Sequence, residues 1–476
     1  MKRYHSLQEI REDIDAGKTS CVELTRYYLS NIKKKSSLNA FLEVYEQEAL
    51  AKAEEIDKKI AAGKAGRLAG MVVGLKDVLC HKDHRLQASS KILDGFKSKF
   101  NATAVQRLID EDAIIIGRQN CDEFAMGSSN ENSAFGPVLN DVDNSRVPGG
   151  SSGGSAAAVQ ADLCLASLGS DTGGSVRQPA AFCGIIGLKP TYSRISRYGL
   201  IAYASSFDCI GIITRSIEDA ALLLEVVAGR DDYDSTVSSR EVPEYTKMLK
   251  TSKKYKIGYL RESVESKGVS DEIKKHTLKA LELLKKQGHI VEPVQFKLLD
   301  YILPTYYILT TAEASSNLSR YDGVRYGYRA EGATDMVSLY KKTRSQGFGK
   351  EVKKRIMLGT FVLSAGYYDA YYTKAQKVRR LIKEETDRIL SQYDFFITPT
   401  TTTVAFKIGE HEGDPLSMYL ADLFTVQANL CGLPAISIPN GCDSNGLPIG
   451  IQLMTKSFAE QELLAFSKYM LELQTN

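Results

Sequence analysis

The chain has 476 residues, of which 43% are hydrophobic and 25% are charged, as in ordinary folded globular proteins. Its 61 Lys and Arg residues and 58 Asp and Glu residues leave a net charge of +3, without the basic surplus that nucleic-acid backbones require. Composition therefore argues against disorder, and we expect a partner to hold any nucleic acid.

The first 62 residues are expected to form a helical region. Ser20 can cap a helix over residues 21–32, and the Ala-, Glu- and Lys-rich residues 46–62 favour another. Residues 1–12 mix charged and polar side chains and lack the apolar stretch of a signal peptide. Because no apolar run reaches the roughly 18 residues that span a bilayer, we expect a cytoplasmic protein.

Residues 63–240 change to short apolar runs separated by turn residues, and these runs alternate with helical patterns. Such a pattern is typical of buried strands in an α/β sheet. The runs are residues 71–75, 113–117, 163–168 and 184–188. We interpret this region as the catalytic core.

Residues 241–400 are expected to be a mostly helical insertion, with a strand, helix and strand over residues 255–296 and a tyrosine-rich helical stretch over residues 300–393. Residues 401–476 return to proline-bounded strands of the core sheet. No repeat or polar linker divides the chain, so we predict one α/β domain over residues 1–476.

Two glycine-rich stretches carry serines, one at residues 149–155 and one at residues 169–175. Glycine permits tight turns that direct several N–H groups to one point, which suits a nucleophile and its oxyanion. The second stretch follows the predicted strand 163–168, and α/β sheets place ligands at the carboxyl ends of strands. This location favours Ser175 as the nucleophile, whereas neither stretch fits the phosphate-binding glycine motifs.

A serine nucleophile needs a base, and no histidine lies near either stretch. Lys76, in an otherwise apolar run, is the best candidate upstream. His81 or His84 as a concealed base stays an alternative. The six histidines have no H-x-x-x-H spacing and the eight cysteines no C-x-x-C pair, so we expect no metal site.

Lys76, residues 150–155 and residues 171–179 (Asp-Thr-Gly-Gly-Ser-Val-Arg-Gln-Pro) together resemble the amidase signature family. The resemblance implies its α/β fold, a large mixed central sheet covered by helices on both faces. It also implies a Ser-cisSer-Lys triad, in which Ser175 is the nucleophile, Ser151 relays the proton and Lys76 is the base. The peptide bond before Ser151 would then be cis.

Backbone N–H groups of the second stretch are the natural oxyanion hole, because a loop at the end of a strand points them at one place. Those of Thr172, Gly173 and Gly174, together with that of Ser175 itself, would meet at one carbonyl oxygen. Losing one such donor typically costs about 3 kcal/mol in the transition state.

Residues 122–128, 313–323 and 355–360 resemble one branch of the family, the glutaminase subunits of tRNA-dependent amidotransferases. This resemblance implies a heterotrimer with B and C subunits. This chain would release ammonia from glutamine without a cofactor of its own. A partner would use ATP and Mg to amidate Glu-tRNA(Gln), which it would also mainly hold.

Glutamine carries a carboxylate and an ammonium that a selective pocket must pair. The resemblance implies that Arg355 binds the carboxylate, Asp422 the ammonium and Tyr306 the side chain. From the sequence alone, a solvated helix charge is the better interpretation of Arg355 and a helix-face acid that of Asp422, and only the resemblance favours the pocket. Tyr301 and Tyr307 compete with Tyr306.

Two other functions stay open. The chain could be a stand-alone amidase for another small amide, or a non-catalytic assembly component. The presence of Lys76, Ser151 and Ser175 argues against the second. The charged residues 81–85 (His-Lys-Asp-His-Arg) depart from what we expect of the branch, and a solvated loop is their plain interpretation.

Overall fold

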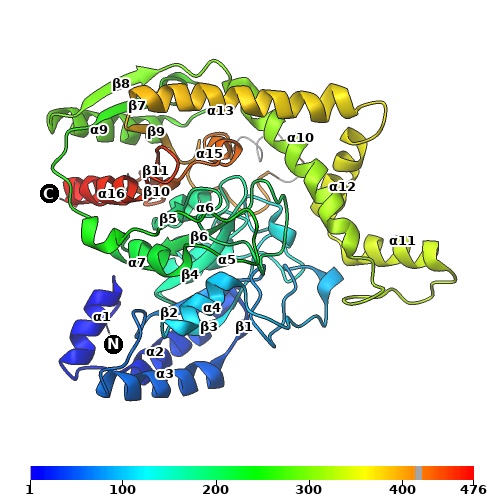
Figure 1. The fold of residues 1–476 in the computed structure, drawn as a ribbon, viewed down its shortest axis with the longest axis horizontal. Helices are drawn as coiled ribbons and strands as arrows, with labels where there is room; N and C mark the ends of the chain where they lie inside the picture. The colour runs from blue at the N-terminus through cyan, green and yellow to red at the C-terminus, as the bar shows by residue number, and fades with distance from the viewer. Residues whose placement is uncertain (1, 412, 414–420, 476) are drawn as a thin grey trace.

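All eleven strands in the described part of the chain join one sheet (Figure 1). The structure, a computed structural model, describes residues 2–411, 413 and 421–475. The sheet order is β1-β3-β2-β4-β6-β5-β10-β11-β9-β7-β8. In chain order the strands are β1 (Phe41–Val44), β2 (Val72–Lys76), β3 (Ile114–Gln119), β4 (Ala166–Asp171), β5 (Ile186–Lys189), β6 (Cys209–Thr214), β7 (Lys256–Leu260), β8 (Ile290–Val294), β9 (Phe395–Pro399), β10 (Ala435–Cys442) and β11 (Pro448–Met454).

The sheet is mixed, as expected. β2 runs parallel to β3 and β4 at one end, and β7 runs parallel to β8 and β9 at the other. The middle strands β6, β5, β10 and β11 are antiparallel to their neighbours. β10 and β11 lie between β5 and β9, so the C-terminal strands join the two ends of the sheet.

Helices cover both faces of the sheet. Every residue of β2, β3, β4, β6 and β11 is buried, and consecutive strand residues point to opposite faces. The helices around the sheet are α1 (Leu7–Asp15), α2 (Cys21–Lys34), α3 (Glu46–Ala61), α4 (Thr103–Asp110), α5 (Gly153–Gln160), α6 (Arg177–Phe182), α7 (Ile217–Val227), α8 (Glu262–Glu265), α9 (Asp271–Lys286), α15 (Val426–Cys431) and α16 (Glu460–Thr475). The predicted α/β fold class is therefore confirmed.

Serine caps fix where several helices begin. Ser20 accepts a hydrogen bond from the Glu23 N–H at the start of α2, as the sequence predicts. Ser216 and Ser270 cap α7 and α9 in the same way. These caps satisfy N–H groups that have no partner inside the first helical turn.

Four further helices form a helical lobe. They are α10 (Leu299–Asn317), α11 (Met336–Gly347), α12 (Lys350–Val362) and α13 (Lys374–Gln392), with a π-helical turn, η6 (Tyr368–Thr373), between the last two. Of these, α11 and α12 lie to one side of the sheet and α13 runs back over β7 and β9 (Figure 1). α10 packs along α12 and α13. In the part of the chain that the structure describes, no helix is both long and apolar enough to cross a membrane.

A substitution at Ile451 measures how much the C-terminal strands contribute to the stability of the sheet. This side chain is fully buried on β11, opposite Ile438 of β10 and Pro399 of β9. We expect Ile451→Ala to lower the free energy of unfolding by about 3 kcal/mol, because it leaves a cavity in a packed core. Urea unfolding measures this, with Leu381→Ala on the exposed side of α13 as the control. Equal stability of both variants would contradict the packing.

Candidate active site

Lys76 is the last residue of β2, and it is fully buried. Its Nζ lies 2.7 Å from the Ser151 Oγ. It also lies 2.9 Å from the Oγ of Ser152 and 2.9 Å from the Oγ of Ser170. Hydroxyl groups accept from an ammonium and donate to a neutral amine, so these contacts suit both protonation states.

Burial lowers the pKa of Lys76 to about 8, because the charged form loses its hydration. The nearby buried acids Asp122, Asp171 and Asp208 raise the pKa and prevent a larger fall. An amine in this range is neutral in a substantial fraction of molecules near neutral pH and can accept a proton.

Ser151 lies in the loop before α5, and the peptide bond from Gly150 to Ser151 is cis, as the resemblance implies. The backbone around it is held on both sides. The Gly150 N–H donates to the Gln178 Oε1 at 2.9 Å, and the Ser151 carbonyl accepts from the Asp122 N–H at 3.1 Å. The Ser151 hydroxyl is thereby directed at Lys76.

Ser175 lies in the turn between β4 and α6. Its carbonyl accepts a hydrogen bond from the Ser152 N–H at 3.1 Å, which joins the two glycine-rich stretches. Lys76 and Ser151 are fully buried, whereas 8% of Ser175 is exposed. Ser175 is thus the most exposed member of the three.

A buried ion pair holds the turn that carries Ser175. The Arg177 Nε and Nη2 donate to the two oxygens of Asp171 at 3.0 and 2.9 Å, and both side chains are fully buried. Burial alone would raise the pKa of Asp171, but the Arg177 charge holds it at about 2. Arg177 also donates to Gln452, the Thr425 carbonyl and Asn429, all from the C-terminal region.

The predicted oxyanion donors are not equivalent in this structure. The Gly174 N–H already donates to the Asp171 Oδ1 at 2.9 Å. Among the described residues, the N–H groups of Thr172, Gly173 and Ser175 have no such partner. These three are the donors open to a ligand, and Gly174 would have to exchange its partner first. At Gly174, a φ of +127° and the close Thr425 side chain exclude other residues.

Arg355 is buried on α12 and is not the solvated helix charge that the sequence alone suggests. Its Nε donates to Glu351 at 2.8 Å and its Nη1 to the Tyr203 hydroxyl at 2.8 Å. The guanidinium also lies 5.5 Å from the centre of the Tyr307 ring. These contacts hold the guanidinium on the buried side of α12.

Asp422 is also buried, with 7% of the residue exposed. It accepts hydrogen bonds from the Ser128 Oγ at 2.7 Å and from the Tyr307 hydroxyl at 3.2 Å. Burial raises its pKa to about 7, against the opposing effect of these donors. Tyr307, in contact with both Arg355 and Asp422, links the two charges that the resemblance assigns to glutamine.

Tyr306 and Tyr307 both face the site, and Tyr301 does not. A Cβ added at Gly173 would lie 2.4 Å from the Tyr306 hydroxyl, so this ring borders the turn that carries Ser175. Tyr301 is 55% exposed on the outer side of α10. The contacts of Tyr307 could not be deduced from the sequence, where it is only a competitor of Tyr306.

Four further residues contact the residues of the site, and three of them lie in motifs of the sequence. Ser152 and Ser170 are in the glycine-rich stretches, and Ser128 closes the motif of residues 122–128. Asn429, whose Nδ2 donates to the Asp171 carbonyl at 3.0 Å, has no sequence signal at all.

The contacts of His81 and His84 do not support either histidine as the base that activates Ser175. The rings of His81 and His84 stack at 3.9 Å, next to Tyr45, and His84 bonds to Glu48 and the Lys82 carbonyl. Their contacts lie outside the lysine and serine cluster. Over residues 2–411, 413 and 421–475, no group of three or more His, Cys, Asp or Glu side chains could hold a metal ion.

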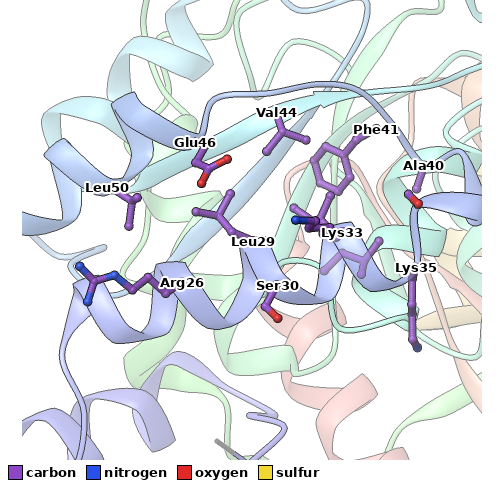
Figure 2. A pocket seen from close by; sticks show the side chains of 13 residues that line it. Arg26, Leu29, Ser30, Lys33, Lys35, Ala40, Phe41, Val44, Glu46 and Leu50 are labelled. Atoms are coloured by element: carbon purple, nitrogen blue, oxygen red, sulfur yellow. The ribbon is translucent and has the colours of Figure 1, made fainter.

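A pocket with a volume of about 720 Å³ lies elsewhere on the molecule. It is beside β1 and between α2 and the start of α3 (Figure 2). It is lined by apolar Leu29, Phe41 and Val44 and by basic Arg26 and Lys33, among others. None of the predicted site residues lines it, so it is separate from the cluster around Lys76.

With Lys76 as the base, we expect kcat on an amide substrate to rise about tenfold per pH unit up to about pH 8 and then level off. Below that pKa the lysine keeps its proton and cannot accept another. A kcat profile from pH ~6 to ~10 measures this, and kcat reports the bound complex, so substrate binding does not enter. Thermal unfolding at each pH serves as the control. A flat profile down to pH ~6 would contradict the role.

Asp171→Asn should lower the free energy of unfolding by about 3 to 5 kcal/mol, because it leaves the Arg177 charge buried without its counterion. Chemical unfolding measures the loss. Asp232→Asn is the matched control, since its ion pair with Arg230 is on the surface and should be dispensable. Similar midpoints for the two variants would contradict the structural role of the buried pair.

Comparison with known proteins agrees with this geometry. The family model described as Amidase matches residues 23–464. The chain is 51% identical over 472 residues, 98% of each chain, to the A subunit of glutamyl-tRNA(Gln) amidotransferase from Chlorobium phaeobacteroides (strain BS1). It is 49% identical to the protein of the same name from Nostoc sp. (strain PCC 7120), over 96% of each chain.

Solved structures give the same picture. The A subunit of glutamyl-tRNA(Gln) amidotransferase from Thermotoga maritima superposes with a TM-score of 0.76 at 42% identity, over 94% of this chain and 91% of that one. The peptide amidase from Stenotrophomonas maltophilia superposes with a TM-score of 0.82 at 30% identity, over 98% of this chain and 96% of that one. Sequence, fold and the cluster around the cis peptide agree, and the chain belongs to the amidase signature family.

Proposed function

We propose that this chain is the glutamine-hydrolysing subunit of a glutamyl-tRNA(Gln) amidotransferase. The observation that carries the proposal is the buried Lys76 Nζ, with a pKa of about 8, 2.7 Å from the hydroxyl of Ser151. Full-length similarity to subunits of that enzyme supports the choice of glutamine over other amides.

In the proposed reaction Ser175 attacks the side-chain carbonyl of glutamine. Its proton passes to Ser151, whose own proton passes to neutral Lys76. The free N–H groups of Thr172 and Gly173, with that of Ser175, stabilise the oxyanion. Ser151 then protonates the leaving nitrogen and recovers a proton from Lys76. Ammonia departs, and water hydrolyses the glutamyl ester to glutamate and free Ser175.

Substrate recognition is proposed to use two buried charges, one on α12 of the lobe and one just before α15. Arg355 binds the α-carboxylate of glutamine, Asp422 binds the α-ammonium, and Tyr306 lies along the side chain next to Gly173. A carboxylate with a pKa near 7 ionises fully when a cation binds beside it. Both charges are then paired in a site that excludes water.

The remaining parts of the reaction fall to partners in this proposal. B and C subunits complete a heterotrimer in the cytoplasm, and a partner with ATP and Mg activates and amidates Glu-tRNA(Gln). This chain needs no cofactor, because Ser175, Ser151 and Lys76 supply the nucleophile, relay and base for hydrolysis.

Ser175→Ala should lower ammonia release from glutamine at least about 1000-fold, and Lys76→Ala nearly as much, because the three residues act as one unit. An ammonia assay on the purified assembly measures both. Ser155→Ala is the matched control: it removes a buried hydroxyl of the neighbouring glycine-rich stretch that has no hydrogen-bond partner in the described structure. Normal turnover by Ser175→Ala would refute the nucleophile.

A stand-alone amidase is the second candidate, because a peptide amidase has the same fold at 30% identity. A panel of small amides assayed with and without partner subunits separates the two. Preference for glutamine, with ammonia release that responds to partners and charged tRNA, supports the amidotransferase role. High activity on other amides without partners supports the alternative. Labelling of Ser175 by a fluorophosphonate probe excludes a non-catalytic assembly component.

A further inference from the structure

Asp208 is a buried carboxylate that takes no part in the proposed proton transfers, and it lies beside the turn that carries Ser175. It directly precedes β6 and is 3% exposed. β6 runs antiparallel to β4, with Cys209 opposite Asp171. The next pair along an antiparallel register joins Asp208 to Thr172, so the sheet itself brings this carboxylate to a residue of the predicted oxyanion hole.

Asp208 accepts hydrogen bonds from Thr172, Tyr203 and Ala204. The Thr172 hydroxyl donates to Oδ1 at 2.6 Å. The N–H groups of Tyr203 and Ala204 both donate to Oδ2 at 3.0 Å, and that of Ala204 also reaches Oδ1 at 3.2 Å. These bonds close residues 203–208 into a loop, which we call the Asp208 loop, and fasten it to the side chain of Thr172.

The Asp208 loop also contacts the two helices assigned to glutamine binding. The Tyr203 hydroxyl accepts a hydrogen bond from the Nη1 of Arg355, on α12, at 2.8 Å. The Phe207 ring packs edge-on against the Tyr306 ring of α10, with ring centres 6.0 Å apart. One loop therefore joins the oxyanion turn to the residues proposed to hold the α-carboxylate and the side chain of the substrate.

Burial and hydrogen bonding act in opposite directions on Asp208. Burial raises the pKa of the carboxyl to about 7, and the bonds from Thr172, Ala204 and Tyr203 oppose this rise. A hydroxyl that donates to a carboxylate is held more firmly than one bound to a neutral acceptor. A fixed Thr172 side chain in turn limits how far the backbone N–H of the same residue can turn.

We propose that Asp208 is a positioning residue that aligns the Thr172 N–H with the oxyanion and, through its loop, places the Tyr203 hydroxyl on Arg355. The inference rests on the proposed function for the roles of Thr172 and Arg355, whereas the hydrogen bonds that join them belong to the fold. Asp208 thus links the group that binds the substrate carboxylate to a group that stabilises the transition state.

Asp208→Asn separates the two connections. Its amide oxygen must face the N–H groups of Tyr203 and Ala204, which can only donate, so its amide nitrogen faces Thr172. The loop is then retained while the Thr172 hydroxyl loses its acceptor. We expect kcat for glutamine to fall at least about tenfold with KM changed less than about twofold, because the oxyanion forms only in the transition state. A normal kcat, or a loss confined to KM, would overturn the proposal.

These constants are measured as ammonia release by the full chain with its partner subunits at about pH 9. Asp208 raises the pKa of Lys76, so removal of its charge lowers that pKa further below its value of about 8. At the chosen pH the lysine is mostly neutral with or without Asp208. A change in the base therefore does not enter the comparison.

Tyr203→Phe tests the other connection, since it removes only the hydroxyl that Arg355 bonds. We expect KM for glutamine to rise about tenfold, the effect of losing one hydrogen bond to a charged group, with kcat changed less than about twofold. A normal KM would overturn the link between the Asp208 loop and the glutamine site.

A double-mutant cycle shows whether Asp208 acts through Thr172. The readout is the rate at which a fluorophosphonate labels Ser175, because the phosphoryl oxygen of the probe takes the oxyanion position and no glutamine is involved. Thr172→Val and Asp208→Asn should each slow labelling at least about tenfold, and the double variant should be no slower than the slower single one. Losses that multiply would overturn the proposal, since independent damage adds to the loss at Thr172.

Asp219→Asn is the matched control. Asp219 is 2% exposed, burial raises its pKa to about 7 as well, and it accepts from the Leu7 N–H at 3.1 Å. This variant should label Ser175 and hydrolyse glutamine normally, even where its thermal unfolding shifts as much as that of Asp208→Asn. Equal slowing of the two variants would overturn the proposal, because loss of any buried carboxylate would then have the same effect.

Failure of the proposed function gives a different result. If the wild-type chain releases no ammonia from glutamine but the labelling cycle shows the coupling, Asp208 stands as a positioning residue and the glutaminase role falls. If glutamine is hydrolysed and the losses multiply, the role stands and the inference falls. A wild-type chain that neither hydrolyses glutamine nor reacts with the probe overturns both.

Discussion

The ion pair of Asp171 and Arg177 is the interaction on which the site depends. Both charges are fully buried, and each oxygen of Asp171 receives a guanidinium N–H. Asp171 also accepts from the Gly174 N–H, so the pair fixes the turn that presents Ser175. A buried pair costs desolvation, and good geometry with further hydrogen bonds offsets that cost. Here the offsetting groups come from the C-terminal region.

Lys76 shows the opposite use of burial. Arg177 is paired with a carboxylate and keeps its charge, whereas Lys76 contacts hydroxyl groups and its pKa falls to about 8. The same low-polarity interior thus contains one cation that serves structure and one amine that can exchange a proton. The difference lies in their nearest neighbours, a carboxylate in one case and serines in the other.

Motifs predicted the centre of the site better than its surroundings. Ser151 and Ser175 lie in glycine-rich stretches that point to chemistry, and Lys76 is a single cation in an apolar run. The cis peptide followed from the resemblance. The roles of Tyr307, Asn429 and Gln452 depend on pairings over more than a hundred residues, which no local pattern encodes. The α/β class followed from apolar runs, but the insertion of β10 and β11 between β5 and β9 is a long-range pairing that periodicity does not reveal.

That insertion has a consequence for how the chain is made. A ribosome releases the chain from its N-terminus, so β5 and β9 emerge before the two strands that join them and leave unpaired edges behind. Thr425, Asn429 and Gln452 emerge late as well, and until then Arg177 lacks its C-terminal partners. The turn that carries Ser175 is therefore fixed only when synthesis is nearly complete. A nascent chain should have no hydrolytic activity, so it releases no ammonia before the subunit that uses ammonia can bind.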